Sequence, residues 1–123
     1  MAYFYIFLTV FFTVFGQVII KYRVVKYAPL PESFIGKVKF LSVVLTDPLI
    51  VVGFFSAFLA SIAWIIVMTK LDLSFAYPIV VGGLALLTSI VSVIILDETV
   101  DAYKLLGLTL IVSGIFVLGR TSV

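Results

Sequence analysis

The sequence predicts an all-α integral membrane protein, a bundle of four transmembrane helices with a short amphipathic interface helix between the first and the second. Of its 123 residues, 64% are hydrophobic and 11% are charged, whereas a soluble domain is roughly half apolar and about a quarter charged. Four apolar stretches approach the roughly 20 residues that a helix needs to cross a bilayer. No linker or low-complexity segment separates them, so we expect a single domain over residues 1–123.

The first apolar stretch predicts a transmembrane helix over about residues 3–27, which Pro29 and Pro31 end. The N-terminus has neither a positively charged region nor a small-residue cleavage site after the apolar stretch. We therefore expect a retained membrane anchor rather than a cleaved signal peptide.

A shorter helical pattern follows over about residues 33–46, with Ser33 as its N-cap. It is too short to span comfortably, and Lys37 and Lys39 interrupt its apolar pattern. We interpret it as an interface helix with its lysines towards lipid headgroups. The alternative is that it lengthens the second transmembrane helix beyond the membrane.

Asp47 as N-cap and Pro48 at the first helical position predict the start of a second transmembrane helix, over about residues 48–69. Small residues on this helix suit close helix packing: Gly53, Ser56, Ala57, Ala60, Ser61 and Ala63. A third helix is expected over about 73–96 and a fourth over about 102–119.

Composition excludes several classes of function. The chain has no cysteine, no histidine and no cluster of carboxylates within its helices, so we expect no metal, no cofactor and no enzymatic activity. The net charge is only +2, and the basic residues lie at helix ends rather than on an exposed basic patch. We therefore expect no nucleic-acid partner.

The cationic residues predict the orientation in the membrane. Residues 21–39 carry five of them and the turn between the third and fourth helices one, whereas the opposite side has two. We expect the connection between helices 1 and 2 in the cytoplasm and both termini outside. The two groups are Lys21, Arg23, Lys26, Lys37, Lys39 and Lys104 against Lys70 and Arg120.

Polar residues in the first helix recur every fourth position as Thr9, Thr13, Gln17 and Lys21, with Gly16 beside them. Residues four apart share a helical face, and such a face in a membrane looks at protein, water or a ligand. The alternatives are local: the threonines can bond to the preceding turn, Gln17 can bond a neighbouring helix, and Lys21 can reach the interface.

Three short motifs, in the third helix, in the turn after it and in the fourth helix, are similar to those of a known transporter family. Leu73–Pro78 reads LSFAYP, Leu96–Thr99 reads LDET and Gly107–Gly114 reads GLTLIVSG. Together with Gly16 and Gln17, these resemble the small multidrug resistance (SMR)-like, EamA-like four-helix branch of the drug/metabolite transporter superfamily. The resemblance covers nearly the whole chain apart from residues 28–46.

Two departures refine this resemblance. Drug-exporting SMR proteins have a glutamate where this chain has Thr13 and a tryptophan where it has Val80. The pattern of Gly16, Gln17 and Lys21, with Ala-Tyr-Pro in the third helix, is more similar to subunits that flip undecaprenyl-phosphate-linked aminoarabinose. The resemblance therefore implies a flippase subunit for a polyprenyl-phosphate-linked sugar in the cytoplasmic membrane.

On this hypothesis Lys21 and Arg23 bind the phosphate, while Thr13, Gln17 and Tyr77 suit the sugar hydroxyls. Tyr77 has the alternative of being an ordinary packed aromatic residue. Two further functions remain open: a small-solute or drug transporter, and an accessory membrane subunit that transports nothing.

Gly107 and Gly114 lie seven residues apart on the fourth helix, which predicts a packing seam. The corresponding seam joins two subunits in SMR proteins. We therefore expect a homodimer or a pair with a paralogous subunit, surrounded by membrane lipids.

Overall fold

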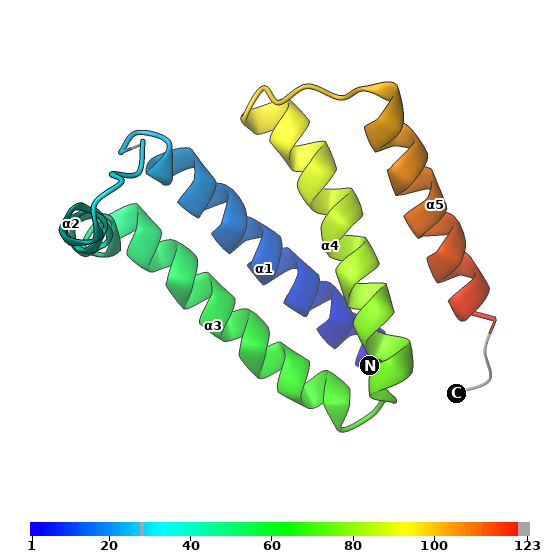
Figure 1. The fold of residues 1–123 in the computed structure, drawn as a ribbon. Helices are drawn as coiled ribbons and strands as arrows, with labels where there is room; N and C mark the ends of the chain where they lie inside the picture. Colours follow the sequence, from blue (N-terminus) through cyan, green and yellow to red (C-terminus); the bar gives the residue numbers. More distant parts are fainter. Residues whose placement is uncertain (28, 121–123) are drawn as a thin grey trace.

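The computed structural model describes residues 1–27 and 29–120, and the regular structure within them is entirely α-helical (Figure 1). This confirms the all-α class. The elements lie close to the ranges expected from the sequence. They are α1 (Ala2–Val24), α2 (Phe34–Leu45), α3 (Pro48–Met68), α4 (Leu73–Ile95) and α5 (Ala102–Leu118).

Three of these helices, α1, α3 and α4, are long and apolar enough to cross a membrane, with 23, 21 and 23 residues. Their mean hydropathies are 2.0, 2.5 and 2.4. The fourth expected span, α5, is apolar but has 17 residues, which is the lower end of the usual length for crossing a bilayer. The structure thus supports three long apolar helices, and the fourth crossing stays a prediction.

Two helix starts have the caps expected from the sequence. The side chain of Ser33 accepts a hydrogen bond from the amide of Gly36 at 2.9 Å. The carboxylate of Asp47 accepts one from the amide of Leu49 at 2.9 Å. Each satisfies a backbone donor that the first turn of a helix leaves without a partner.

The end of α1 differs from the expected one. The helix stops at Val24 rather than near Tyr27, because the amides of Lys26 and Tyr27 bond three residues back, to the carbonyls of Arg23 and Val24. Such bonds tighten the last turn. Tyr27 is therefore turned out of the helix, where its hydroxyl reaches Asp47.

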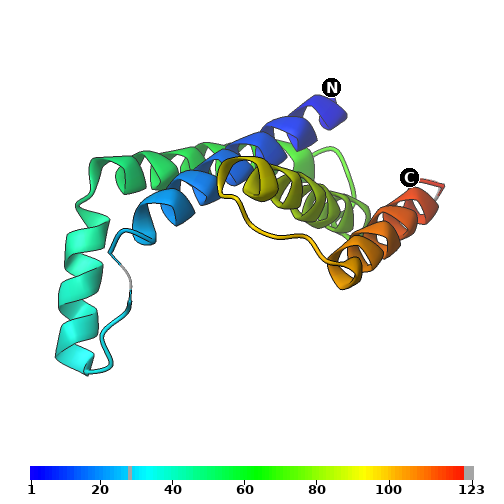
Figure 2. The ribbon, with the colours of Figure 1, turned by 90° about the horizontal axis from the view of Figure 1, so that it is seen from above.

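The short helix α2 is a separate element and does not lengthen α3. It runs across the direction of the other helices at the end where α1 stops and α3 starts (Figure 2). Its buried residue is Val44, whereas Phe34 and Ile35 are 81% and 68% exposed. Most of its apolar surface is therefore uncovered by the chain.

The closest helix pair is α1 and α3. A Cβ atom placed on Gly16 would lie 2.6 Å from the carbonyl oxygen of Gly53, so only glycine allows this approach. The hydroxyl of Ser56 donates a hydrogen bond of 2.6 Å to the carbonyl of Phe12 across the interface. Gly16 thus brings α3 close instead of leaving open space beside the polar residues.

The apolar core lies among α1, α3 and α4, and α5 is attached at its edge (Figure 1). Ile115 and Ile111 of α5 reach Gly82 of α4, yet α5 itself has no buried residue among those that the structure describes. The core cluster is Ile6, Val10, Val14, Val67, Ala76 and Val80.

Candidate functional site

The polar face of α1 passes from the core to the surface. Thr9 is buried, and its hydroxyl donates to the carbonyl of Tyr5 at 2.8 Å, which is the local alternative expected for it. Thr13 is half-buried, while Gln17 and Lys21 are exposed. The last two therefore are the members of this face that a ligand can reach.

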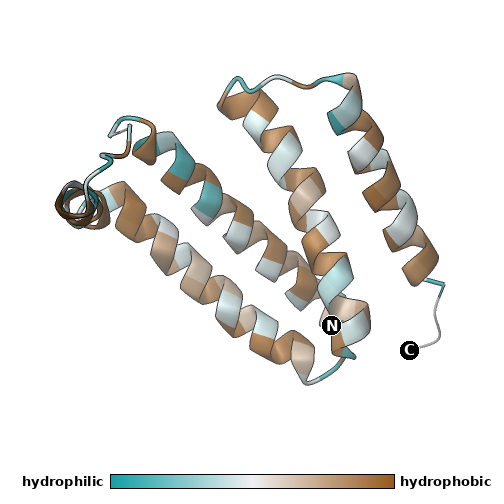
Figure 3. Ribbon diagram, viewed as in Figure 1, coloured by the Kyte–Doolittle hydropathy of each residue, from teal (hydrophilic) through white to brown (hydrophobic). Residues whose placement is uncertain are grey.

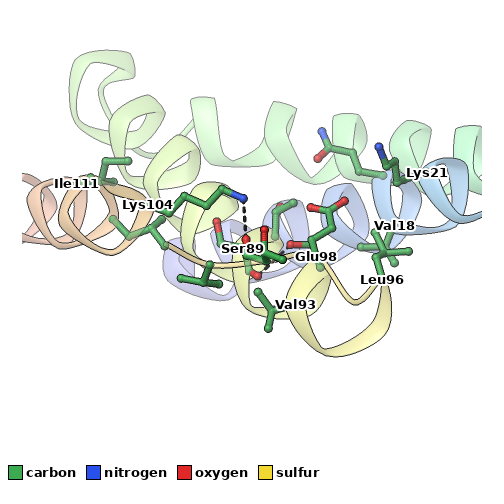
Figure 4. Close-up of a pocket in the computed structure, with 15 residues that line it drawn as sticks. Val18, Lys21, Ser89, Val93, Leu96, Glu98, Lys104 and Ile111 are labelled. Atoms are coloured by element: carbon green, nitrogen blue, oxygen red, sulfur yellow. Dashed lines mark hydrogen bonds between the residues drawn. The ribbon is translucent and has the colours of Figure 1, made fainter. Parts of the chain in front are cut away.

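Gln17 and Lys21 line a cavity of about 560 Å³ at the end of the molecule where α4 stops and α5 starts (Figure 4). Figure 3 shows hydrophilic colour at the same ends of α1 and α5. The cavity is open, since several of the lining side chains are exposed. Its polar lining comes from α1, α4, the connection after α4, and α5: Gln17, Lys21, Thr88, Ser89, Ser92, Glu98, Thr99 and Lys104.

Arg23 does not reach this cavity. Its guanidinium forms an ion pair with Asp47, with Nη2 at 2.6 Å from Oδ2 and Nε at 3.2 Å from both carboxylate oxygens. Arg23 lies two positions after Lys21, which turns their side chains to different sides of α1. The expected role of Arg23 as a second phosphate ligand is therefore not supported by its position.

Asp47 joins three segments of the chain. Its carboxylate accepts hydrogen bonds from Arg23, from the hydroxyl of Tyr27 and from the amides of Leu49 and Ile50. The bonds from Arg23 and Tyr27, in that order, hold the pKa of Asp47 well below its usual range. This buried residue fixes the end of α1 against the start of α3.

Tyr77 also lies away from the cavity. It is 57% exposed and its ring meets that of Trp64 edge-on, with ring centroids 6.1 Å apart. This is the packed aromatic alternative. Gly107 lines the cavity. Among the residues that the structure describes, none has an atom within 4 Å of where a Cβ of Gly107 or Gly114 would lie.

Sequence reasoning missed Glu98 and Lys104, because the acidic turn after α4 reads as solvated. The available signal was Asp97, since aspartate adopts the left-handed backbone conformation more readily than most residues. Asp97 has φ 55°, and the amide of Glu98 bonds back to the carbonyl of Ser92 at 3.2 Å. The chain thereby returns over the end of α4 and places Glu98 in the cavity.

A second, apolar groove of about 480 Å³ lies on another face of the α1–α4 contact. Val18 lines both spaces, so the groove and the cavity meet along α1. Aromatic and aliphatic side chains dominate it, among them Phe11, Phe15, Leu87 and Val91.

The long apolar helices are those of a multi-pass membrane protein, and an open cavity of mixed charge lies at one end of the bundle. The chain is similar to a probable 4-amino-4-deoxy-L-arabinose-phosphoundecaprenol flippase subunit, ArnE, of Pseudomonas aeruginosa (strain UCBPP-PA14). The two are 33% identical over 64 residues, which is 52% of this chain and 55% of the relative.

This similarity confirms the resemblance to flippase subunits that the helix motifs indicated. The matched region spans about half the length of that relative. No family model matches the chain, and no solved structure matches it.

Proposed function

We propose that this chain is a subunit of a flippase that moves a polyprenyl-phosphate-linked sugar between the leaflets of the cytoplasmic membrane. The observation that carries the proposal is the cavity in which Gln17 and Lys21 lie together, open at the surface of a membrane bundle. The similar protein is a probable flippase subunit for an amino sugar on phosphoundecaprenol, which points to the same ligand class.

The cavity has groups for each part of such a head group. Lys21 supplies a cation for the phosphate, and Lys104 on the opposite wall supplies a second one in place of Arg23. Gln17 both donates and accepts hydrogen bonds, as sugar hydroxyls require. Thr13, one turn further into α1, extends this polar path towards the core.

The lipid tail stays outside the protein in this proposal. A long polyprenyl chain is too large for a bundle of 123 residues to enclose, and the cavity is open at its side. The tail then remains among membrane lipids, against apolar surface such as the groove beside Val18.

The proposed membrane arrangement is one domain with four crossings. Helices α1, α3, α4 and the shorter α5 span the bilayer, and α2 lies in the interface because it runs across the ends of α1 and α3 (Figure 2). In this arrangement the end with the excess of lysine and arginine, and with it the cavity, faces the cytoplasm, as the charge bias favours.

A second subunit completes the wall in our proposal. Helix α5 has no buried residue in the described part of the chain, and the space beside Gly107 and Gly114 is open. These glycines allow another helix to approach closely. The second subunit is either a copy of this chain or a paralogue.

The test is transport in vesicles, using the protein isolated with any subunit that copurifies. A fluorescent polyprenyl-phosphate sugar is followed between leaflets. We expect Lys21→Ala to slow transport roughly tenfold, because a charge-assisted bond to phosphate is lost. Lys21→Arg keeps part of the rate, since the charge survives while its geometry changes. Gln17→Leu slows transport without unfolding the protein.

The matched control is Lys70→Ala, which removes an exposed lysine from the turn between α3 and α4, at the other end of the bundle. It is expected to transport at the normal rate. Full activity in both Lys21→Ala and Gln17→Leu would show that the polar face of α1 is structural and would refute the proposed site.

A further inference from the structure

Charges of both signs line the cavity. Lys21 and Lys104 bring two ammonium groups, and Glu98 brings a carboxylate (Figure 4). In that view the carboxylate of Glu98 lies between the two lysines and is turned towards the cavity. A site for a phosphate and a neutral sugar needs the cations and has no use for the anion.

The backbone holds Glu98 in this place. Asp97 in the left-handed conformation turns the chain, and the amide of Glu98 is fixed on the carbonyl of Ser92. On the far side, the ammonium of Lys104 donates to the carbonyl of Thr99 at 2.7 Å. The connection is thus tied to both helices that it joins, so the backbone at Glu98 has a defined position at the cavity wall.

Glu98 is free to meet a ligand. Among the residues that the structure describes, its carboxylate forms no ion pair within 4.0 Å, whereas Asp47 has Arg23 as its partner. The carboxylate is therefore not there to neutralise Lys21 or Lys104. Near a bound phosphate an unpaired carboxylate weakens binding by like-charge repulsion, unless the ligand brings a cation to it.

We propose that Glu98 determines specificity by receiving a cationic amine on the sugar, while Lys21 and Lys104 hold the phosphate. The site thereby selects head groups that carry both charges over those that carry the phosphate alone. This inference rests on the proposed function, because it assigns a further residue of the same site. Glu98 acts by direct contact with the amine of the head group.

The test is binding, measured with the full chain in lipid nanodiscs. Three short-chain probes are used: farnesyl phosphate, a farnesyl-phosphate amino sugar, and the same sugar with its amine acetylated. Acetylation removes the positive charge and keeps the ring. The proteins are the unmodified chain, Glu98→Gln, Lys21→Ala and the control Glu32→Gln, which alters an exposed glutamate outside the cavity.

We expect the unmodified chain to bind the amino sugar about tenfold more tightly than its acetylated form, the scale of a charge-assisted hydrogen bond. Glu98→Gln abolishes this preference, because it weakens binding of the amino sugar and relieves the repulsion that weakens binding of the acetylated form. Glu32→Gln keeps the preference. A preference that survives Glu98→Gln, or an equal change for both sugars, overturns the inference and leaves the proposed function standing.

Failure of the proposed function has a different signature. It is shown if the unmodified chain binds none of the three probes, or if Lys21→Ala leaves the affinity for farnesyl phosphate unchanged. Either result also overturns the role of Glu98, because that role depends on a phosphate bound at Lys21.

Discussion

The α1–α3 pair and helix α5 are attached to the molecule in opposite ways. The pair is joined by a glycine–glycine contact, by the hydrogen bond from Ser56 to Phe12, and by the Arg23–Asp47 ion pair at its end. Helix α5 packs on α4, and no residue of it is buried. The chain therefore combines one firmly held helix pair with one helix that few contacts restrain.

The two regions meet in the cavity, where α1 supplies Gln17 and Lys21 and α5 supplies Lys104. One wall is thus firmly fixed and the other is weakly packed. Segments with few buried contacts open at lower free energy than the core. In the proposed function the ligand is released into either leaflet, and a weakly packed wall suits that release.

The largest stability loss is expected where the firm region is tied together. Asp47→Ala leaves the guanidinium of Arg23 and the hydroxyl of Tyr27 without their partner and removes the N-cap of α3. We expect a larger fall in melting temperature in detergent than for any other change considered below. Glu32→Ala, at an exposed residue, is the control. Equal melting temperatures for the two variants would contradict a structural role for the ion pair.

The same residue predicts an acid dependence. The pKa of Asp47 is lowered in the folded protein, so its contribution is fully present above the unfolded-state pKa of about 3.9. It is lost progressively as pH falls below about 4, because the unfolded chain then binds a proton that the folded carboxylate, held by Arg23, does not bind. Melting temperatures between about pH 7 and pH 3 should fall less in Asp47→Asn than in the unmodified chain. Parallel curves would exclude Asp47 as a source of the acid sensitivity.

The next largest change in stability is expected from replacing a glycine by alanine, once in the α1–α3 pair and once in α5. In Gly16→Ala the new methyl group meets the backbone of Gly53, and we expect a loss of about 2 kcal/mol from strain. In Gly114→Ala the methyl group meets nothing within 4 Å, and better helix propensity stabilises by up to about 1 kcal/mol. Unfolding by SDS in mixed micelles measures both. Changes of the same sign would show that the two regions are packed alike.

Much of the fold could be predicted from the sequence because the determining signals are local. The Asp47–Pro48 pair, the cap Ser33 and the apolar stretches act over a few residues, and the helices start within a residue or two of the expected positions. Of the small residues expected to pack on the second helix, Gly53, Ser56, Ala60 and Ala63 are buried. Ala57 and Ser61 are exposed instead.

The site was less predictable, because it depends on which helix faces lie opposite one another. The four-residue spacing correctly put Gln17 and Lys21 on one face. It could not show that Arg23 would pair with Asp47, which lies 24 residues further along the chain. Glu98 could not be predicted as a cavity residue for a related reason, since its place in the cavity follows from the left-handed backbone at Asp97 rather than from a helical pattern.

A smaller effect concerns what covers α5. Gly114→Leu adds bulk where the described part of the chain has no atom within 4 Å of the Cβ position, so monomer stability should hold while association weakens roughly tenfold. Val112→Leu enlarges a side chain on the opposite face of α5 and is the control. Crosslinking in lipid reports the oligomer. If Gly114→Leu and the unmodified chain crosslink equally, the glycine face is not the interface.

The smallest expected loss of stability comes from removing a serine hydroxyl, and it should be larger for a hydrogen bond between two helices than for one within a helix. The hydroxyl of Ser56 on α3 reaches the carbonyl of Phe12 on α1, whereas that of Ser61 reaches the carbonyl of Ala57 one turn back. Hydrogen bonds between membrane helices contribute about 0.6 kcal/mol on average, so Ser56→Ala should lose roughly that much. Ser61→Ala should lose less, because its bond holds no second helix. Equal losses in SDS unfolding would mean that the α1–α3 pair is held by its close backbone contact and its ion pair alone.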